Sequence, residues 1–326
     1  MFSFADRFRN FVRNIYMMYN RVEIFRGMNE VSRKHYGEDF IDTYELGKGM
    51  FYEMANSHPL LEEPRVTSNR IKYIGGIGFK PAKNITDQYH SILSSVHSGA
   101  IIISFGSQVS ADAFPPHVVD SFINTAKNLP QFTFIWRYTK PLRDVPSNLH
   151  IVDWLPQNDL LQSPKVVAFV SHMGMNSFIE SAFAGVPFLS IPLFADQVHN
   201  AYNAHRLGMG VILRKNEINR ESMLSKTKEI LFNETYLNRA REISSMLSIY
   251  PDDPSEIFVE TVEFAAKASR LSEQFVLPGV NLQVWEHLGY DIVIILYSLF
   301  LIAIYVSFNI VRCVVSQISV RKVKSE

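Results

Sequence analysis

Short apolar runs alternate with amphipathic segments through the middle of this 326-residue chain, and this alternation restricts the possible folds more than any other feature. The apolar runs predict strands at Ile101–Phe105, Phe132–Trp136, Ile151–Asp153, Val166–Ser171, Phe188–Ile191 and Val211–Leu213. The amphipathic segments predict helices at Phe114–Asn128, Met175–Ala184, Val198–Leu207, Glu221–Phe232, Tyr236–Ser248 and Glu256–Leu271. Such alternation produces βαβ units, in which helices cover both faces of a parallel sheet. We therefore expect an α/β fold with one doubly wound parallel sheet.

The domain boundaries follow from changes in this pattern. Residues 1–85 are mixed and mostly helical, and residues 86–275 form the expected sheet domain. A linker at residues 276–291 leads to an apolar stretch at residues 292–311, and a short tail at residues 312–326 follows.

The apolar stretch reads IVIILYSLFLIAIYVSFNIV and contains no charged residue. A helix of about 20 residues, rising ~1.5 Å per residue, crosses a hydrocarbon core of ~30 Å. The alternative is a buried core helix, but core helices are rarely apolar on every side over about five turns. We therefore expect one membrane-spanning helix.

Charged residues beside this stretch predict its orientation. Asp291 precedes it, whereas Arg312, Arg321, Lys322 and Lys324 follow it, so the positive-inside rule predicts a cytoplasmic tail. The last five residues, KVKSE, resemble the K-x-K-x-x retrieval signal of endoplasmic-reticulum membrane proteins. We expect a single-pass protein of that membrane, with a lumenal body if a signal peptide exists upstream.

The first residues, MFSFADRFRNFVRNIYMMYN, do not have the pattern of a signal peptide, because arginines interrupt every apolar run. Phe4, Phe8, Phe11 and Ile15 recur at helical spacing along one face. That face either packs on a domain, which the pattern favours, or lies on a membrane surface. Insertion of the chain as written by its tail would leave the body in the cytosol.

Charge and cysteine content exclude two classes of protein. The 32 basic and 32 acidic residues give a formal net charge of zero, so we expect no nucleic-acid partner. Cys313 is the single cysteine, so no internal disulfide can form. It lies at the inner edge of the expected span, either as a palmitoylation site or as an ordinary residue.

Residues that follow the expected strands are candidates for a ligand site, because doubly wound sheets bind ligands outside the carboxyl ends of their strands. Gly106-Ser107 follows the first strand, where a glycine permits close approach and a hydroxyl can donate to phosphate. Such a pair also occurs in ordinary turns.

The segment after the fourth expected strand has stronger features. His172 and Gly174 lead into a helix that begins with Met175-Asn176-Ser177 and contains Glu180. The free amides and the dipole at a helix N-terminus suit a pyrophosphate. His172 either donates to phosphate or has a structural role, and Asn176 and Ser177 either add hydrogen bonds or cap the helix.

Two further pairs flank this segment. Trp154 follows the third expected strand, and it is either a stacking surface for a base or a core residue. Gln157 carries an amide able to pair with a uracil edge. Asp196 and Gln197 follow the fifth strand, and they suit sugar hydroxyls as well as the start of a helix.

In sequence order, WLPQNDLL, HMGMNSFIES and GVPFLSIPLFADQ resemble the donor-site motif of the UDP-glycosyltransferase family, in its animal UDP-glucuronosyltransferase branch. A motif of about forty residues with fixed spacing is far more specific than a lone glycine-rich loop. The resemblance extends to NSHPLLEEPRVTSNRIKYIGGIG, to the ISFGS strand and to the C-terminal span, so it covers essentially the whole chain.

The resemblance implies a site for a UDP-sugar, which is a co-substrate, so no cofactor and no metal are implied. It implies donor-binding roles for Ser107, Trp154, Gln157, His172, Gly174, Asn176, Ser177, Glu180, Asp196 and Gln197. The tryptophan would stack on uracil, Gln157 would contact its edge, and Glu180 would hold the ribose. Ser107, His172, Asn176 and Ser177 would surround the diphosphate, and Asp196 and Gln197 would bind the transferred sugar.

Such enzymes invert the anomeric centre when a base deprotonates the acceptor hydroxyl, which then displaces UDP. The resemblance implies small lipophilic alcohols or phenols as acceptors and leaves open glucuronosyl or glucosyl transfer. Association with relatives as homo- or hetero-oligomers is a further possibility. Asn84-Ile-Thr86 and Asn233-Glu-Thr235 are sequons for N-glycosylation of a lumenal body.

The general base of the family is a histidine near the start of an N-terminal domain, of which residues 1–85 resemble the last part. His35, His58, His90 and His97 lie in no motif that identifies a base, so no catalytic residue is assigned. The chain is then an enzyme by family, but we expect little turnover from the chain itself. The sequence would represent a truncated gene model, a short isoform or a non-catalytic relative. The alternative function is a donor-binding module that regulates full-length relatives. A nucleotide-dependent oxidoreductase is disfavoured, because no G-x-G-x-x-G follows an expected strand.

Overall fold

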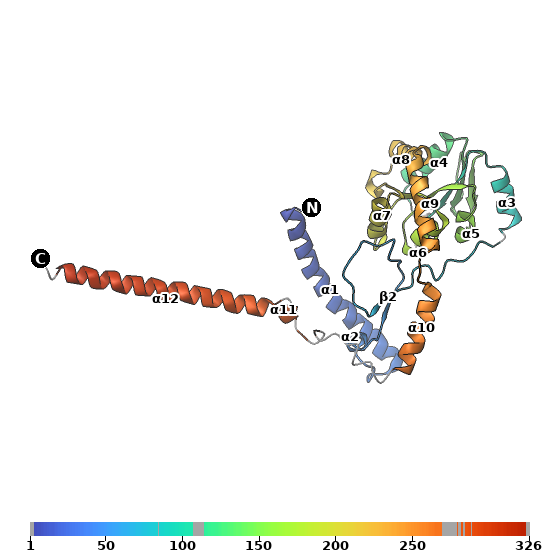
Figure 1. Ribbon diagram of the computed structural model, residues 1–326. Coiled ribbons are helices and arrows are strands. Elements are labelled where there is room, and N and C mark those ends of the chain that lie inside the picture. The colour runs from blue at the N-terminus through green and yellow to red at the C-terminus, as the bar shows by residue number, and fades with distance from the viewer. Residues whose placement is uncertain are drawn as a thin grey trace. The chain divides into compact units, whose positions relative to one another are not determined.

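The computed structural model describes residues 3–83, 85–106, 114–268, 279, 282, 284–287 and 289–323. The chain forms two compact units, one made of Met1–Phe51 with Ala268–Glu326 and the other of Tyr52–Lys267 (Figure 1). The second unit contains residues 52–85 together with the sheet, and the boundary expected at residue 86 stays a prediction.

A six-stranded parallel sheet forms the centre of the Tyr52–Lys267 unit. Its strands are β3 (Ala100–Ser104), β4 (Thr133–Arg137), β5 (Leu149–Val152), β6 (Val166–Ser171), β7 (Phe188–Ser190) and β8 (Gly210–Ile212). The strand order β5-β4-β3-β6-β7-β8 reverses direction between β3 and β6. This reversal is the topological switch point of a doubly wound sheet, so the α/β fold expected from the sequence is confirmed.

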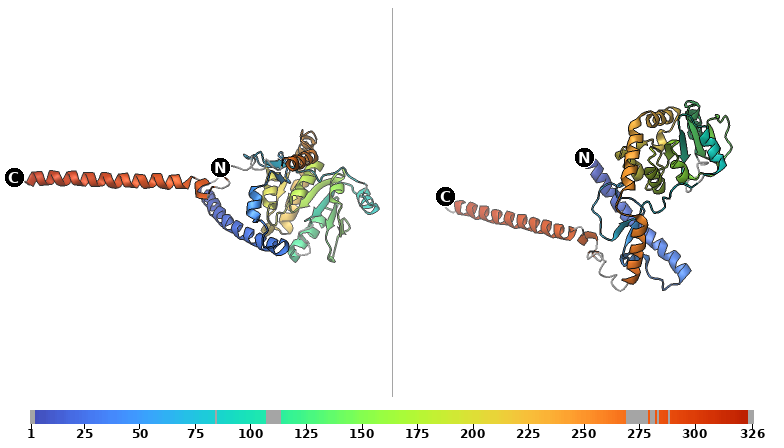
Figure 2. Two further views of the ribbon diagram at one scale, coloured as in Figure 1. Left: turned by 90° about the horizontal axis from the view of Figure 1, so that it is seen from below. Right: turned by 45° about the vertical axis from the view of Figure 1, so that its right-hand side comes forward.

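Helices cover both faces of the sheet (Figures 1 and 2). They are α3 (Asp87–Ser94), α4 (Pro116–Lys127), α5 (Gln157–Leu161), α6 (Met175–Ala184), α7 (Gln197–Arg206), α8 (Arg220–Phe232) and α9 (Glu234–Ser248). Ile102 packs in one core cluster with α6, α7 and α9, whereas Ile101 and Ile103 pack in another with α4 and α8. Alternate side chains of a strand point to opposite faces, so the apolar run in β3 supplies both cores.

The same unit contains a two-stranded parallel sheet of β1 (Glu53–Ala55) and β2 (Ile71–Tyr73), which the sequence did not predict. Leu61, between these strands, is buried in the core cluster of α6 and α7. A short 3₁₀-helix, η2, spans Lys215–Glu217, and helix α10 spans Pro254–Lys267. The helix expected at Glu256–Leu271 is therefore present, although its expected last residue lies outside the described residues.

The other unit contains α1 (Phe4–Tyr36), α2 (Thr43–Lys48), α11 (Val284–His287) and α12 (Tyr290–Val323). Helix α12 is continuous in both views of Figure 2. Its part from Tyr290 to Arg312 has a mean hydropathy of 2.3 and no buried side chain, so by length and composition it can cross a membrane. In α1, the expected apolar face, represented by Phe4 and Phe8, is exposed.

Candidate functional site

A cleft of about 560 Å³ lies at the carboxyl ends of β3 and β6, where the strand order reverses. The lining residues are Asn56, Ser104, Gly106, Arg137, Trp154, Leu155, Pro156, Gln157, Asn158, Asp159, His172, Gly174, Met175, Asn176, Ser177 and Glu180. Ligands of doubly wound proteins bind at such switch points. The cleft therefore has the position and the polar lining of a ligand site.

The imidazole of His172 lies between two glycines. A Cβ atom at Gly106 would lie 2.7 Å from the ring Cε1 atom, and one at Gly174 would lie 2.6 Å from Nε2. Gly106 also has a φ of 72°, which favours glycine. Burial lowers the pKa of His172, although the charge of Asp196 and a backbone hydrogen bond of Ser104 oppose the shift. The ring is therefore neutral at neutral pH.

One nitrogen of this buried ring has no partner. His172 is 8% exposed, and its Nδ1 atom has no hydrogen-bond partner within the part of the chain that the structure describes. Buried polar atoms are usually satisfied, and a neutral imidazole offers one donor and one acceptor. Nδ1 itself is inaccessible, and the ring atoms nearest the two cleft-lining glycines are Nε2 and Cε1.

Helix α6 begins beside the imidazole without a capping side chain. Gly174 is its N-cap, and no acidic residue lies in its first turn. The first amides of a helix lack intrahelical acceptors, and the helix dipole adds partial positive charge at this end. The start of α6 is therefore suited to an anion such as a phosphate.

The turn before α6 has a strained backbone. Met173 has a φ of 64°, which is uncommon for a residue with a side chain. Its carbonyl oxygen accepts a hydrogen bond of 3.0 Å from Asn200 Nδ2, and its amide donates to Ser171 Oγ at 3.1 Å. These contacts hold His172 and Gly174 at the cleft.

Three side chains form a polar cluster in the cleft lining. Gln157 Nε2 donates to Glu180 Oε2 at 2.7 Å and to Ser177 Oγ at 3.2 Å. Burial raises the pKa of Glu180, the hydrogen bond from Gln157 lowers it, and the charge of Asp159 raises it further. The carboxylate can accept hydrogen bonds from a pair of hydroxyl groups.

The indole of Trp154 is 67% exposed, which excludes the alternative that it is a core residue. The Arg137 guanidinium carbon lies 5.3 Å from the centre of its ring. Arg137 also donates to the carbonyl oxygens of Gly106 at 2.7 Å and Asp153 at 3.2 Å. An exposed indole braced by a guanidinium provides a flat surface for a base.

Arg137 and Asn56 are cleft residues that the sequence analysis missed. Arg137 is the last residue of the otherwise apolar strand β4, and this break in the pattern could have indicated it. Asn56 Nδ2 donates to Asn176 Oδ1 at 2.8 Å from 120 residues away, and no local pattern predicts this contact.

The two expected sugar-binding residues lie at the start of α7. Asp196 is its N-cap, and its Oδ2 atom accepts from Asn200 Nδ2 at 2.8 Å. Gln197 is buried, and its Oε1 atom accepts from the amides of Leu193 at 2.9 Å and Phe194 at 3.1 Å. Neither residue lines the cleft, so their roles stay predictions. Ser107 lies outside the described residues.

His58 is buried by packing and does not line the cleft. Its ring makes an edge contact with Tyr250, and its Nδ1 atom accepts from the amide of Leu60 at 3.2 Å. No group of three or more His, Cys, Asp or Glu side chains that could hold a metal occurs among the described residues.

The family model described as "UDP-glucoronosyl and UDP-glucosyl transferase" matches residues 1–325. The chain belongs to the UDP-glycosyltransferase family. It is 26% identical to UDP-glucosyltransferase 2 of Dactylopius coccus over 89% of this chain and 56% of that protein. It is 33% identical to the putative UDP-glucuronosyltransferase ugt-60 of Caenorhabditis elegans, over 66% of this chain and 43% of that protein. It is 30% identical to human UDP-glucuronosyltransferase 1A6, over 81% of this chain and 49% of that protein.

The UDP-glycosyltransferase chain therefore spans about half the length of these curated relatives. Among solved structures, the glycotransferase of kitacinnamycin aligns with a TM-score of 0.58 and 16% identity, over 80% of this chain and 66% of that one. Os79 from O. sativa, in complex with U2F and trichothecene, aligns with a TM-score of 0.52 and 22% identity, over 61% of this chain and 49% of that one. These similarities show the glycosyltransferase fold.

Proposed function

We propose that the cleft at the β3–β6 switch point binds a UDP-sugar, and that the protein transfers its glucuronosyl or glucosyl group to small lipophilic hydroxyl acceptors. The observation that carries the proposal is the His172 imidazole, held between Gly106 and Gly174 in the cleft lining, beside the uncapped N-terminus of α6. Both features are suited to the oxygens of a diphosphate.

The other lining residues of the cleft are suited to the base and the ribose of the donor. The exposed face of Trp154 stacks on uracil, and the carboxylate of Glu180 accepts hydrogen bonds from the ribose hydroxyls. Gln157, next to Glu180, contacts the base edge. Asp196 and Gln197, at the head of α7, bind the transferred sugar.

The reaction we propose is an inverting displacement that needs no metal. As the acceptor oxygen attacks the anomeric carbon, the bond to UDP breaks and negative charge builds up on the diphosphate. The α6 amides and His172 stabilise that charge, and such preorganised electrostatic stabilisation is usually the largest catalytic contribution. We assign no general base to this chain.

A second candidate function is donor binding without transfer, in association with full-length relatives. It is favoured because His172 is the only histidine among the described residues that line the cleft. A base typically contributes about 10²–10⁴-fold to the rate, so a cleft without one binds a donor but turns it over slowly.

We also propose that α12 anchors the protein in the endoplasmic-reticulum membrane, with a cytoplasmic tail and a lumenal body. Asn233 is exposed, and its Oδ1 atom accepts from the amide of Thr235 at 3.2 Å at the start of α9. Asn84 lies outside the described residues. A lumenal body should carry a glycan on at least one of these two asparagines. The absence of any endoglycosidase-sensitive mass shift would contradict this topology.

The experiment that tests the function is sugar transfer by membranes that express the chain, with labelled UDP-glucuronic acid or UDP-glucose and a generic phenol. Product formation should disappear in a His172→Ala/Asp196→Ala variant. Equal product from both proteins would contradict the proposal. UDP binding without product would favour the second candidate.

A further inference from the structure

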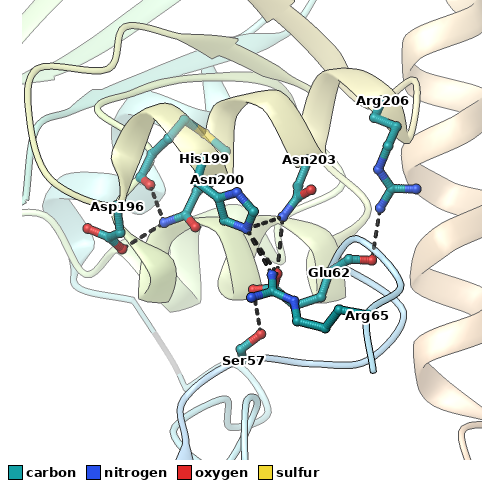
Figure 3. Close-up of polar contacts among 9 residues, drawn as sticks. Ser57, Glu62, Arg65, Asp196, His199, Asn200, Asn203 and Arg206 are labelled. Carbon is teal, nitrogen blue, oxygen red and sulfur yellow. Dashed lines mark hydrogen bonds and ion pairs between the residues drawn. The ribbon is translucent and has the colours of Figure 1, made fainter. Parts of the chain in front are cut away.

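The segment between β1 and β2 contacts both α6 and α7. Asn56 contacts Asn176 in the first turn of α6, and Glu62 lies against α7 (Figure 3). Leu61 anchors the same segment in the core. The segment can therefore fix α6 and α7 relative to each other.

Glu62 is the centre of the contacts with α7 (Figure 3). Its Oε2 atom lies 3.0 Å from His199 Nε2 and accepts from Asn203 Nδ2 at 3.3 Å and from Arg65 Nη2 at 2.7 Å. Its Oε1 atom accepts from Ser57 Oγ at 2.7 Å. One carboxylate thus joins four side chains, two of them from α7.

Burial and charge show that this carboxylate is held in its ionised form. The Glu62 side chain is 11% exposed. Burial raises the pKa of Glu62, but hydrogen bonds from His199 and Ser57, with the charges of His199 and Arg65, outweigh this effect and leave the pKa below its usual value. Removing the charge would weaken the hydrogen bond that Glu62 accepts from the fully buried Asn203 amide, because hydrogen bonds to charged groups are stronger than those to neutral ones.

The face of α7 that Glu62 holds also carries Asp196 and Asn200. Asn200 Nδ2 donates to Asp196 Oδ2 at 2.8 Å and to the Met173 carbonyl oxygen at 3.0 Å. Figure 3 shows Asp196, His199, Asn200 and Asn203 along this helix. At its last turn, Arg206 donates to the backbone oxygen of Glu62 at 2.9 Å. A shift of α7 would therefore move Asp196.

We propose that Glu62 is a positioning residue for the donor's sugar: by holding α7 at His199 and Asn203, it fixes Asp196 against the sugar's hydroxyl groups. The inference rests on the proposed function, which assigns the sugar to Asp196. Hydrogen bonds weaken steeply as their angles worsen, so a small shift of the helix reduces the sugar's contribution to binding.

The test compares dissociation constants for UDP, UDP-glucose and UDP-glucuronic acid, measured by calorimetry on the full chain in detergent. The variant is Glu62→Gln, which keeps the side-chain shape, and the control is Glu63→Gln at the exposed neighbouring position. We expect Glu62→Gln to raise the ratio of the UDP-sugar constant to the UDP constant about fivefold, with UDP itself changed less than about twofold. The control should leave both constants unchanged.

Two further variants keep the test decisive. Adding Asp196→Asn to Glu62→Gln should raise the ratio no further than Asp196→Asn alone, because both act on one contact. His199→Ala removes a side chain that is 43% exposed, so it endangers folding less, and it should raise the ratio about twofold.

Each outcome has a defined meaning. An unchanged ratio in Glu62→Gln and His199→Ala, or equal weakening of UDP and UDP-sugar, overturns the positioning role and leaves the proposed function intact. If the wild type binds UDP but Asp196→Asn leaves the ratio of the two constants unchanged, the placement of the sugar at Asp196 is overturned. A folded wild-type protein that binds no UDP overturns the proposed function, and the inference with it.

Discussion

The turns that lead into α6 and α7 share a backbone feature but use their polar groups differently. Each contains a residue with positive φ, Met173 at 64° and Ala195 at 52°. Before α7, Gln197 satisfies the amides of Leu193 and Phe194 within the protein. Neither helix has a side-chain cap on its first amides, but His172 and Gly174 before α6 line the cleft, whereas Asp196 and Gln197 do not.

The difference indicates a division of roles between the two helices. Polar groups that line a concave site are available to a ligand, whereas groups that bond only within the protein support the structure. We therefore expect changes at the α6 turn to affect phosphate binding first. Changes along α7 should affect stability and the placement of the sugar.

The largest effect is expected for Gly174→Ala. The new Cβ atom would lie 2.6 Å from His172 Nε2, so it would displace the ring and obstruct the first amides of α6. UDP affinity should fall about 100-fold, as expected for misplaced binding groups. Gly78→Ala is the matched control, because no atom lies within 4 Å of its Cβ position. Calorimetric titration with UDP measures the affinity of both variants. Similar affinities of Gly174→Ala and Gly78→Ala would remove the distinction between the two turns.

A smaller effect on stability is expected for Asn200→Ala. This fully buried side chain donates to Asp196 and to the Met173 carbonyl, so its loss should lower the free energy of unfolding by about 2 kcal/mol. Asn69→Ala, at an exposed position, is the control. Thermal unfolding followed by circular dichroism provides the comparison, and equal midpoints would contradict a supporting role for α7.

Trp154→Ala should weaken UDP binding about tenfold, because stacking of a base on an aromatic ring contributes about 1–3 kcal/mol. Trp285→Ala, an exposed tryptophan in the other unit, should leave UDP binding unchanged. Inorganic pyrophosphate, which has no base, should bind Trp154→Ala as well as it binds the wild type. Weaker pyrophosphate binding would show that the indole supports the α6 turn instead of the base.

The smallest effect concerns pH. Burial lowers the pKa of His172, so the folded protein binds fewer protons there than the unfolded chain. The associated stability is present above the unfolded pKa of about 6.5 and is lost as pH falls through and below that value. The unfolding midpoint of the wild type should therefore drop more between pH 7.5 and 5.5 than that of His172→Gln. Parallel drops would mean that the imidazole is not buried.

The alternation of apolar runs predicted the parallel sheet because each strand is buried on both faces, as in β3 and β6. It missed α3 and α5, which are short, and β1 and β2, which have three residues each and no alternating pattern. Residues that follow the strands, such as His172 and Trp154, could be predicted because the topology of the sheet brings strand ends together.

Contacts between distant segments could not be predicted in the same way. Glu62 and His199 are 137 residues apart, and no periodicity connects them. The use of Gln197 within its own loop depends on the path of the backbone at Leu193 and Phe194. Sequence motifs therefore identified residues that line the cleft, such as His172 and Trp154, but not the distant contacts that support the neighbouring helices.

Binding of UDP to the full chain in detergent tests the central claim most directly. Calorimetry of wild type, His172→Ala and His90→Ala, the last at an exposed histidine outside the cleft, isolates the contribution of the imidazole between the two glycines. We predict one UDP site, unchanged affinity in His90→Ala, and affinity at least about tenfold weaker in His172→Ala. Wild-type affinity in His172→Ala, or no binding of UDP by the folded wild-type chain, would contradict the account.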